Sequence, residues 1–137
     1  MTKTFKLDKL VRDKTYQMMI DEKMEFTLKP LSSHNALLTQ FKAKLLEEAH
    51  EVAQATTQQE MILELADCLE VIHEFANTLG ISFDEVETQR QSKRQKQGGF
   101  EKKIVVDTVT APIENPWVSY FLKNPNKYPE ITNNDAI

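Results

Sequence analysis

Apolar side chains recur roughly every three to four positions up to about residue 97, a spacing typical of helices that bury one face. The pattern predicts a short helix over residues 15–22, with Asp13 as its N-cap. It also predicts a longer helix that Ser32 or Ser33 caps and that ends at about residue 55.

Two capping boxes predict the next two helices. Residues 57–60 form the first box, and Gly80 ends the helix that this box starts. Residues 82–85 form the second box, and its helix ends at the glycine pair 98–99.

Proline marks a change in the chain after the helical body, because four of the five prolines follow residue 110. Residues 98–137 therefore form an irregular tail, and we expect strand only over residues 25–28 and 103–106. Aromatic residues indicate that the tail packs on something, since disordered segments usually lack them. These residues are Trp117, Tyr120, Phe121 and Tyr128.

The composition is that of an ordinary globular protein of 137 residues, and its net charge of −4 excludes a bulk polycation for nucleic acid or a membrane surface. No apolar run approaches the ~18 residues of a membrane span. The N-terminus lacks the apolar core of a secretory signal. The lone cysteine, Cys68, makes no internal disulfide. We therefore expect a cytoplasmic protein with no nucleic-acid or membrane partner.

Carboxylates intrude on the buried face of the helix predicted to end at residue 55. With Phe41 at 0° on a helical wheel, the apolar residues occupy one arc: Leu37, Leu38, Leu45, Ala49 and Val52. Glu48 falls at about −20°, inside that arc, and Glu51 and Lys44 fall on its edge at roughly −80° and −60°. Glu47 lies further out, near −120°.

The helix that follows shows the same feature. With Met61 at 0°, one apolar arc contains Leu65, Cys68, Leu69, Ile72, Phe75, Ala76 and Leu79. Glu64 falls near −60°, beside Val71, and Asp67 follows near −120°.

Two carboxylate pairs with i,i+3 spacing therefore lie in or beside buried faces: Glu48 with Glu51, and Glu64 with Asp67. Any one such pair is common on a solvated helix, but four converging carboxylates repel one another and are costly to bury. A divalent cation removes both problems, and oxygen ligands alone favour Mg²⁺ or Mn²⁺.

A di-iron site is the competing interpretation, because His50 and His73 each complete a Glu-x-x-His spacing. Both histidines fall on polar sides of their helices, about 180° and 120° from the core centres. Ligands of a di-iron bundle must project inward together, so the wheel favours two solvated histidines.

The acidic residues together read EExxE over 47–51 and ExxD over 64–67. Residues 9–14 read KLVRDK, and Lys93 precedes Gly-Gly-Phe at 98–100. In this combination the chain resembles the MazG-like all-α nucleoside triphosphate pyrophosphohydrolases, a superfamily that includes the phosphoribosyl-ATP pyrophosphohydrolases and dimeric dUTPases. Gln97 stands where the family pattern has arginine.

The resemblance implies an all-α, MazG-like bundle of four to five helices with an irregular C-terminal tail. Residues 1–110 would form the pyrophosphohydrolase domain. Residues 111–137 would be a tail rich in proline and aromatic residues, packed on the body or on a neighbouring subunit. It also implies a homodimer or homotetramer, which fits the apolar Leu63 on a polar helix side.

The resemblance further implies Mg²⁺-dependent cleavage of a nucleoside triphosphate between the α and β phosphates, as in the house-cleaning of (d)NTPs. The implied Mg²⁺ ligands are Glu48, Glu51, Glu64 and Asp67. Glu47 would support those ligands or take a proton from the attacking water, and Lys93 would supply a catalytic positive charge. The candidate phosphate-binding residues are Lys44, Lys93, Arg94, Lys96, Gln97, Arg12 and Lys14.

Two alternatives stay open at this level. The chain could be a phosphoribosyl-ATP pyrophosphohydrolase, or a helical interaction module that keeps the fold without catalysis. Gln97 favours the second alternative because glutamine cannot neutralise a phosphate, whereas the four acidic positions speak against it.

Overall fold

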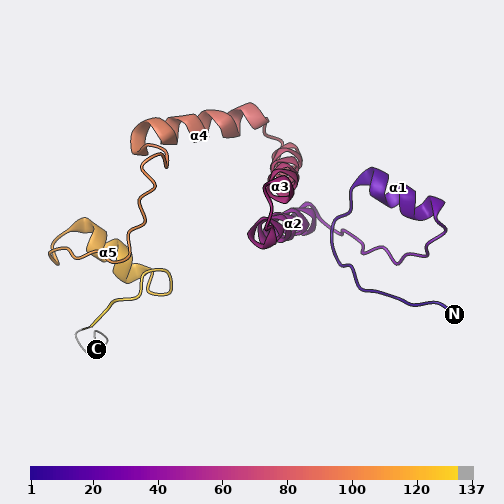
Figure 1. Ribbon diagram of the computed structural model, residues 1–137, viewed down its shortest axis with the longest axis horizontal. Coiled ribbons are helices and arrows are strands. Elements are labelled where there is room, and N and C mark those ends of the chain that lie inside the picture. The colour runs from indigo at the N-terminus through magenta and orange to yellow at the C-terminus, as the bar shows by residue number, and fades with distance from the viewer. Residues whose placement is uncertain (133–137) are drawn as a thin grey trace. The chain divides into compact units, whose positions relative to one another are not determined.

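The computed structural model describes residues 1–132, and the regular elements in this part of the chain are helices (Figure 1). They are α1 (Asp13–Asp21), α2 (His34–Gln54), α3 (Gln58–Thr78), α4 (Phe83–Gln97) and α5 (Pro116–Lys123). Contacts divide the chain into two units, Met1–Gln97 and Gly98–Ile137. In the described part, no helix is both long and apolar enough to cross a bilayer.

Helices α2 and α3 form the centre of the first unit, where they pack side by side (Figure 1). Phe41 of α2 stacks on Phe75 of α3 with ring centroids 5.8 Å apart. Since Phe41 lies early in α2 and Phe75 lies late in α3, the two helices run in opposite directions. Helix α4 packs on α3 in turn.

Side-chain caps fix the starts of these helices, as the sequence predicts. Ser33 Oγ accepts a hydrogen bond from the Ala36 amide at 3.1 Å. Both halves of the capping box at Thr57 and Glu60 are formed, with distances of 3.1 and 3.4 Å. Ser82 Oγ accepts from the backbone amide three positions on, at 3.2 Å.

Gly80 ends α3, also as predicted. Its φ of +75° lies in the left-handed region, which residues other than glycine rarely adopt. The Gly80 amide donates to the Asn77 carbonyl and the Ile81 amide to the Ala76 carbonyl, each at 3.0 Å. This pair of bonds is a Schellman motif, which satisfies carbonyls that the end of the helix leaves free.

Two local predictions are wrong. Asp13 is the first residue of α1 rather than its cap, because the Arg12 carbonyl already accepts from the Tyr16 amide at 2.9 Å. Residues 25–28 and 103–106 form no strand, and residues 1–132 contain none. Phe26 instead packs on the Tyr16 ring with centroids 5.2 Å apart.

The second unit contains α5, an eight-residue helix within an otherwise irregular tail. The Asn115 side chain caps it by accepting from the Trp117 amide at 3.0 Å, and Pro116 occupies the first turn. The aromatic residues of the tail contact one another, and they are Trp117, Tyr120, Phe121 and Tyr128. Where the tail packs stays a prediction, and residues 133–137 lie outside the described part.

The interior of the first unit is small. In residues 1–132 the buried apolar residues are Val71 and Ala76. The predicted buried arc of α3 is only partly covered, since Leu65 and Leu69 are 57% and 48% exposed. The arc is too wide for one helix to cover, so α2 covers only one edge of it.

Candidate metal and phosphate site

Three carboxylates from α2 and α3 converge at the covered edge. One oxygen each of Glu48, Glu64 and Asp67 lies within 4.8 Å of the others. Glu48 is buried, with 9% of its surface exposed, and the other two are partly buried. We call these three residues the acidic cluster.

Helix geometry explains how the acidic cluster forms. Glu64 and Asp67 are three positions apart and therefore lie on the same side of α3. That side is the edge of the apolar arc that packs on α2, and Glu48 lies inside the buried arc of α2. The prediction that Glu48 lies on a buried helix face is confirmed.

Glu64 is the member of the acidic cluster whose surroundings raise its pKa. Loss of hydration raises the pKa of Glu64, and the charges of Asp67, Glu51 and Glu48 raise it further. Burial and the same cluster also raise the pKa of the Cys68 thiol, which stays protonated at neutral pH. Oxygen ligands held together with excess negative charge suit a divalent cation such as Mg²⁺, so the residues fit the metal that the sequence suggests.

Glu51 is the predicted ligand that stands apart from the acidic cluster. It is exposed on α2 and is not one of the three converging carboxylates. Its charge still contributes to the raised pKa of Glu64, so it lies within electrostatic range. Its role as a ligand stays a prediction.

Positive side chains flank the acidic cluster on two sides. Lys44 Nζ lies 3.2 Å from Glu48 Oε1 and 3.3 Å from Glu47 Oε2. Arg12 Nη2 lies 2.7 Å from Asp67 Oδ1. The structure therefore brings two of the predicted phosphate-binding residues, Lys44 and Arg12, directly to the carboxylates.

Glu47 is held by two lysines. Its carboxylate is 3.0 Å from Lys9 Nζ and 3.3 Å from Lys44 Nζ. Partial burial raises the pKa of Glu47, but the hydrogen bond from Lys9 and the charge of Lys44 outweigh that effect and leave the pKa below its ordinary value. A carboxylate whose pKa is lowered accepts a proton less readily, which favours a supporting role for Glu47 over that of a base.

A cleft of about 480 Å³ opens beside Glu47, between the segment 6–10 and α2. Lys6, Lys9 and Lys44 line it together with Asp8 and the Gln40 amide. Its size is within the range of small-molecule sites, ~300–1,000 Å³. Its wall of lysines next to the acidic cluster suits an anionic ligand.

Three predicted phosphate-binding residues of α4 show no ion pair with the acidic cluster within residues 1–132. They are Lys93, Lys96 and Gln97, and all three are exposed. Lys14 is likewise exposed, on α1. Their phosphate-binding roles, and that of Arg94, stay predictions.

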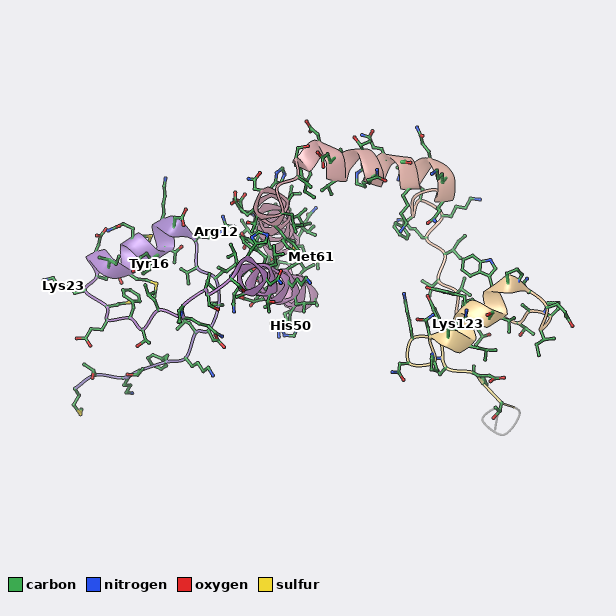
Figure 2. All side chains as sticks on the ribbon, turned by 180° about the vertical axis from the view of Figure 1, so that it is seen from behind. Arg12, Tyr16, Lys23, His50, Met61 and Lys123 are labelled. Atoms are coloured by element: carbon green, nitrogen blue, oxygen red, sulfur yellow. The ribbon has the colours of Figure 1, made fainter. Side chains whose placement is uncertain are left out.

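The histidines take no part in a metal cluster within the described residues. His73 stacks on Phe83 of α4 with ring centroids 3.7 Å apart. His50, which is labelled in Figure 2, is exposed. The acidic cluster consists of carboxylates alone. The geometry therefore supports the preference for an oxygen-ligand site over a di-iron site.

Lys9 is the site residue that sequence reasoning missed. It pairs with Glu47, 38 positions away in the chain. The signal for Lys9 is its place as the first residue of the KLVRDK segment, in which the sequence predicts phosphate-binding roles for Arg12 and Lys14.

Comparison with known families agrees with this geometry. The sequence model of the phosphoribosyl-ATP pyrophosphohydrolase family matches residues 8–94. No curated protein and no solved structure matches the chain significantly. The matched region includes the acidic cluster together with Lys9, Arg12 and Lys44. Because the match covers more than half of the sequence, the chain belongs to the phosphoribosyl-ATP pyrophosphohydrolase family.

Proposed function

We propose that this protein is a Mg²⁺-dependent nucleoside triphosphate pyrophosphohydrolase that serves in the house-cleaning of (d)NTPs. The observation that carries the proposal is the acidic cluster with cations on both flanks. Carboxylates alone would repel a triphosphate, and cations alone would bind it without chemistry. The combination suits a reaction in which a metal and basic side chains share the phosphate charge.

Glu48, Glu64 and Asp67 would hold the metal, with Glu51 as a further ligand. Mg²⁺ is the expected ion, and Mn²⁺ is the alternative with the same ligand preference. A bound Mg²⁺ would offset phosphate charge and lower the pKa of an attacking water.

The remaining groups bind and orient the substrate. Lys44 lies between the acidic cluster and the cleft, where it would contact the phosphate chain. Glu47 would hold Lys9 and Lys44 at the wall of that cleft. Exposed residues of α4 would add contacts to the phosphates, with Lys93 supplying the main charge. These residues are Lys93, Arg94, Lys96 and Gln97.

In the reaction, water attacks one of the two phosphorus atoms that share the α–β anhydride oxygen. The bond from that phosphorus to the bridging oxygen breaks. The products are a nucleoside monophosphate and pyrophosphate, and the water releases one proton on balance.

Phosphoribosyl-ATP is the second candidate substrate, and the family match favours it. It contains the same α–β anhydride, so the same residues would serve. The two candidates differ in the purine end of the molecule, which carries a second ribose phosphate in phosphoribosyl-ATP.

The test is an assay of the full chain against NTPs, dNTPs, oxidised analogues and phosphoribosyl-ATP, each with and without Mg²⁺. We expect pyrophosphate and a monophosphate only when Mg²⁺ is present. Asp67→Asn should lower kcat/KM by about 100-fold or more, because it removes a charged metal ligand. The matched control is Asp84→Asn, an exposed carboxylate of α4.

Three outcomes separate the alternatives. Release of inorganic phosphate with a diphosphate product would mean that a different bond is cleaved. Turnover of phosphoribosyl-ATP alone would select the second candidate. Absence of turnover on the whole panel would leave the interaction module as the better interpretation.

A further inference from the structure

Arg12 lies on a carboxylate that the proposed function assigns to the metal. Its Nη2 atom is 2.7 Å from Asp67 Oδ1, and Asp67 belongs to the acidic cluster. An oxygen that accepts a hydrogen bond from a guanidinium is less available to a cation, and the two positive charges repel each other. Arg12 and a divalent cation therefore compete for Asp67.

The backbone of Arg12 is anchored in the structure, whereas its side chain is largely exposed to solvent. Arg12 is the N-cap residue of α1 and lies where that helix starts (Figure 2). Its carbonyl accepts a hydrogen bond from the Tyr16 amide at 2.9 Å. The preceding residues Leu10 and Val11 are partly buried. The Arg12 side chain, in contrast, is 57% exposed. Its guanidinium can therefore leave Asp67 while its Cα stays where it is.

Lys44 is the instructive contrast on the other flank. Its side chain is 16% exposed and lies between Glu47 and Glu48. Exposed ion pairs are weak because water screens both charges, whereas a partly buried pair loses that screening. The pair of Arg12 with Asp67 is thus the one that an arriving cation breaks more easily.

We propose that Arg12 is an exchangeable counter-ion of the acidic cluster. It pairs with Asp67 when no metal is bound, and it binds the substrate phosphates once a divalent cation has taken Asp67. The proposal rests on the proposed function, since it requires a phosphate ligand at this site. A guanidinium suits both partners, because its fork of donors matches carboxylate and phosphate oxygens alike.

Manganese binding without nucleotide tests the first half of the exchange. Arg12→Gln removes the charge, and free Mn²⁺ is measured by electron paramagnetic resonance on the full chain. We expect the variant to bind Mn²⁺ about two- to fivefold more tightly than the wild type, the factor that an exposed ion pair represents. Arg12→Ala should do the same, and it serves if Arg12→Gln fails to fold.

Arg90→Gln is the matched control. The Arg90 side chain is 58% exposed and pairs with Glu87 on α4 at 2.6 Å, so the substitution removes an equally exposed ion pair away from the acidic cluster. Its Mn²⁺ affinity should equal that of the wild type. A gain in both variants would show a nonspecific effect of net charge and would overturn the exchange.

Nucleotide binding tests the second half. The probe is a nucleoside triphosphate with a non-hydrolysable imido bridge between the α and β phosphates, titrated at saturating Mn²⁺. Arg12→Gln should bind it about 10- to 100-fold more weakly, the range for hydrogen bonds to charged groups. Changes of opposite sign for metal and nucleotide are the signature, because a merely structural Arg12 would weaken both or neither.

The results separate this proposal from the proposed function. Unchanged or weaker Mn²⁺ binding in both Arg12 variants overturns the exchange. Tighter Mn²⁺ binding with unchanged nucleotide binding overturns the transfer of Arg12 to phosphate. If both shifts occur and no pyrophosphate is released from any substrate, the exchange stands and the proposed reaction falls.

Discussion

Glu48 and Glu64 belong to the same acidic cluster, but their charges are balanced differently. Lys44 lies 3.2 Å from Glu48 and compensates its burial. Among the described residues, Glu64 has no such ion pair, and loss of hydration together with neighbouring carboxylates raises its pKa. Glu64 is therefore the residue whose charge most lacks compensation in the metal-free protein, and the one that gains most from a cation.

Replacing Glu64 tests this imbalance. Glu64→Gln keeps the shape of the side chain and removes its charge, so the melting temperature of the metal-free protein should rise. Added Mg²⁺ should raise the melting temperature of the wild type by mass action and raise that of the variant far less. Differential scanning fluorimetry across a Mg²⁺ titration measures both effects.

Glu74→Gln is the control for that experiment, because Glu74 is an exposed carboxylate of the same helix. It should respond to Mg²⁺ like the wild type. If Mg²⁺ stabilises Glu64→Gln as much as the wild type, Glu64 is not a ligand.

At the scale of the element, α3 carries the local signals that define a helix at both ends. Its first turn is closed by the Thr57 and Glu60 capping box, and its last turn by the Schellman motif at Gly80. These bonds fix the residues at which α3 begins and ends, and helical spacing then decides which of its side chains face α2. The ends of α3 therefore affect the acidic cluster, because Glu64 and Asp67 lie on the edge of α3 that packs on α2.

Removing the cap should cost stability. Thr57→Ala deletes the acceptor of the Glu60 amide and should lower the free energy of unfolding by about 1 kcal/mol, the usual cost of losing an N-cap. The midpoint of urea unfolding measures the change.

Thr39→Ala provides the comparison for Thr57→Ala. The Thr39 hydroxyl donates to the Asn35 carbonyl within α2, a bond that a helix does not need. Its unfolding midpoint should change little or rise slightly, since alanine favours helices. Equal losses in the two variants would contradict the capping role of Thr57.

At the scale of the whole molecule, the most conspicuous feature is apolar surface on α3. Met61, Ile62, Leu65 and Leu69 are between 41% and 57% exposed, and we call them the α3 apolar face. Residues on one side of a helix that are this apolar are usually covered in the working protein.

The predicted homodimer or homotetramer would cover the α3 apolar face. Light scattering coupled to size exclusion should therefore give a mass of two or four chains. Leu65→Glu should shift the protein toward the monomer, because it places a charge in the middle of the face. Val105→Glu is the control, since Val105 is 94% exposed and belongs to the other unit. A monomeric wild type would contradict the prediction.

The sequence alone determined the helices of the first unit and two carboxylate pairs. Each rests on groups a few positions apart, such as Ser33 with Ala36, or Glu64 with Asp67. Local hydrogen bonds and helical spacing fix such features wherever the rest of the chain lies. The start of α5 is equally local, because Asn115 followed by Pro116 is a common helix start signal.

Only the tertiary structure decided which charges meet. Lys9 pairs with Glu47 across 38 positions, and Arg12 pairs with Asp67 across 55. It also decided that α2 covers the edge of α3 that carries the acidic cluster and leaves Leu65 exposed. Periodicity says that a helix has an apolar face, but the position of the partner helix along that face depends on packing between segments far apart in the chain.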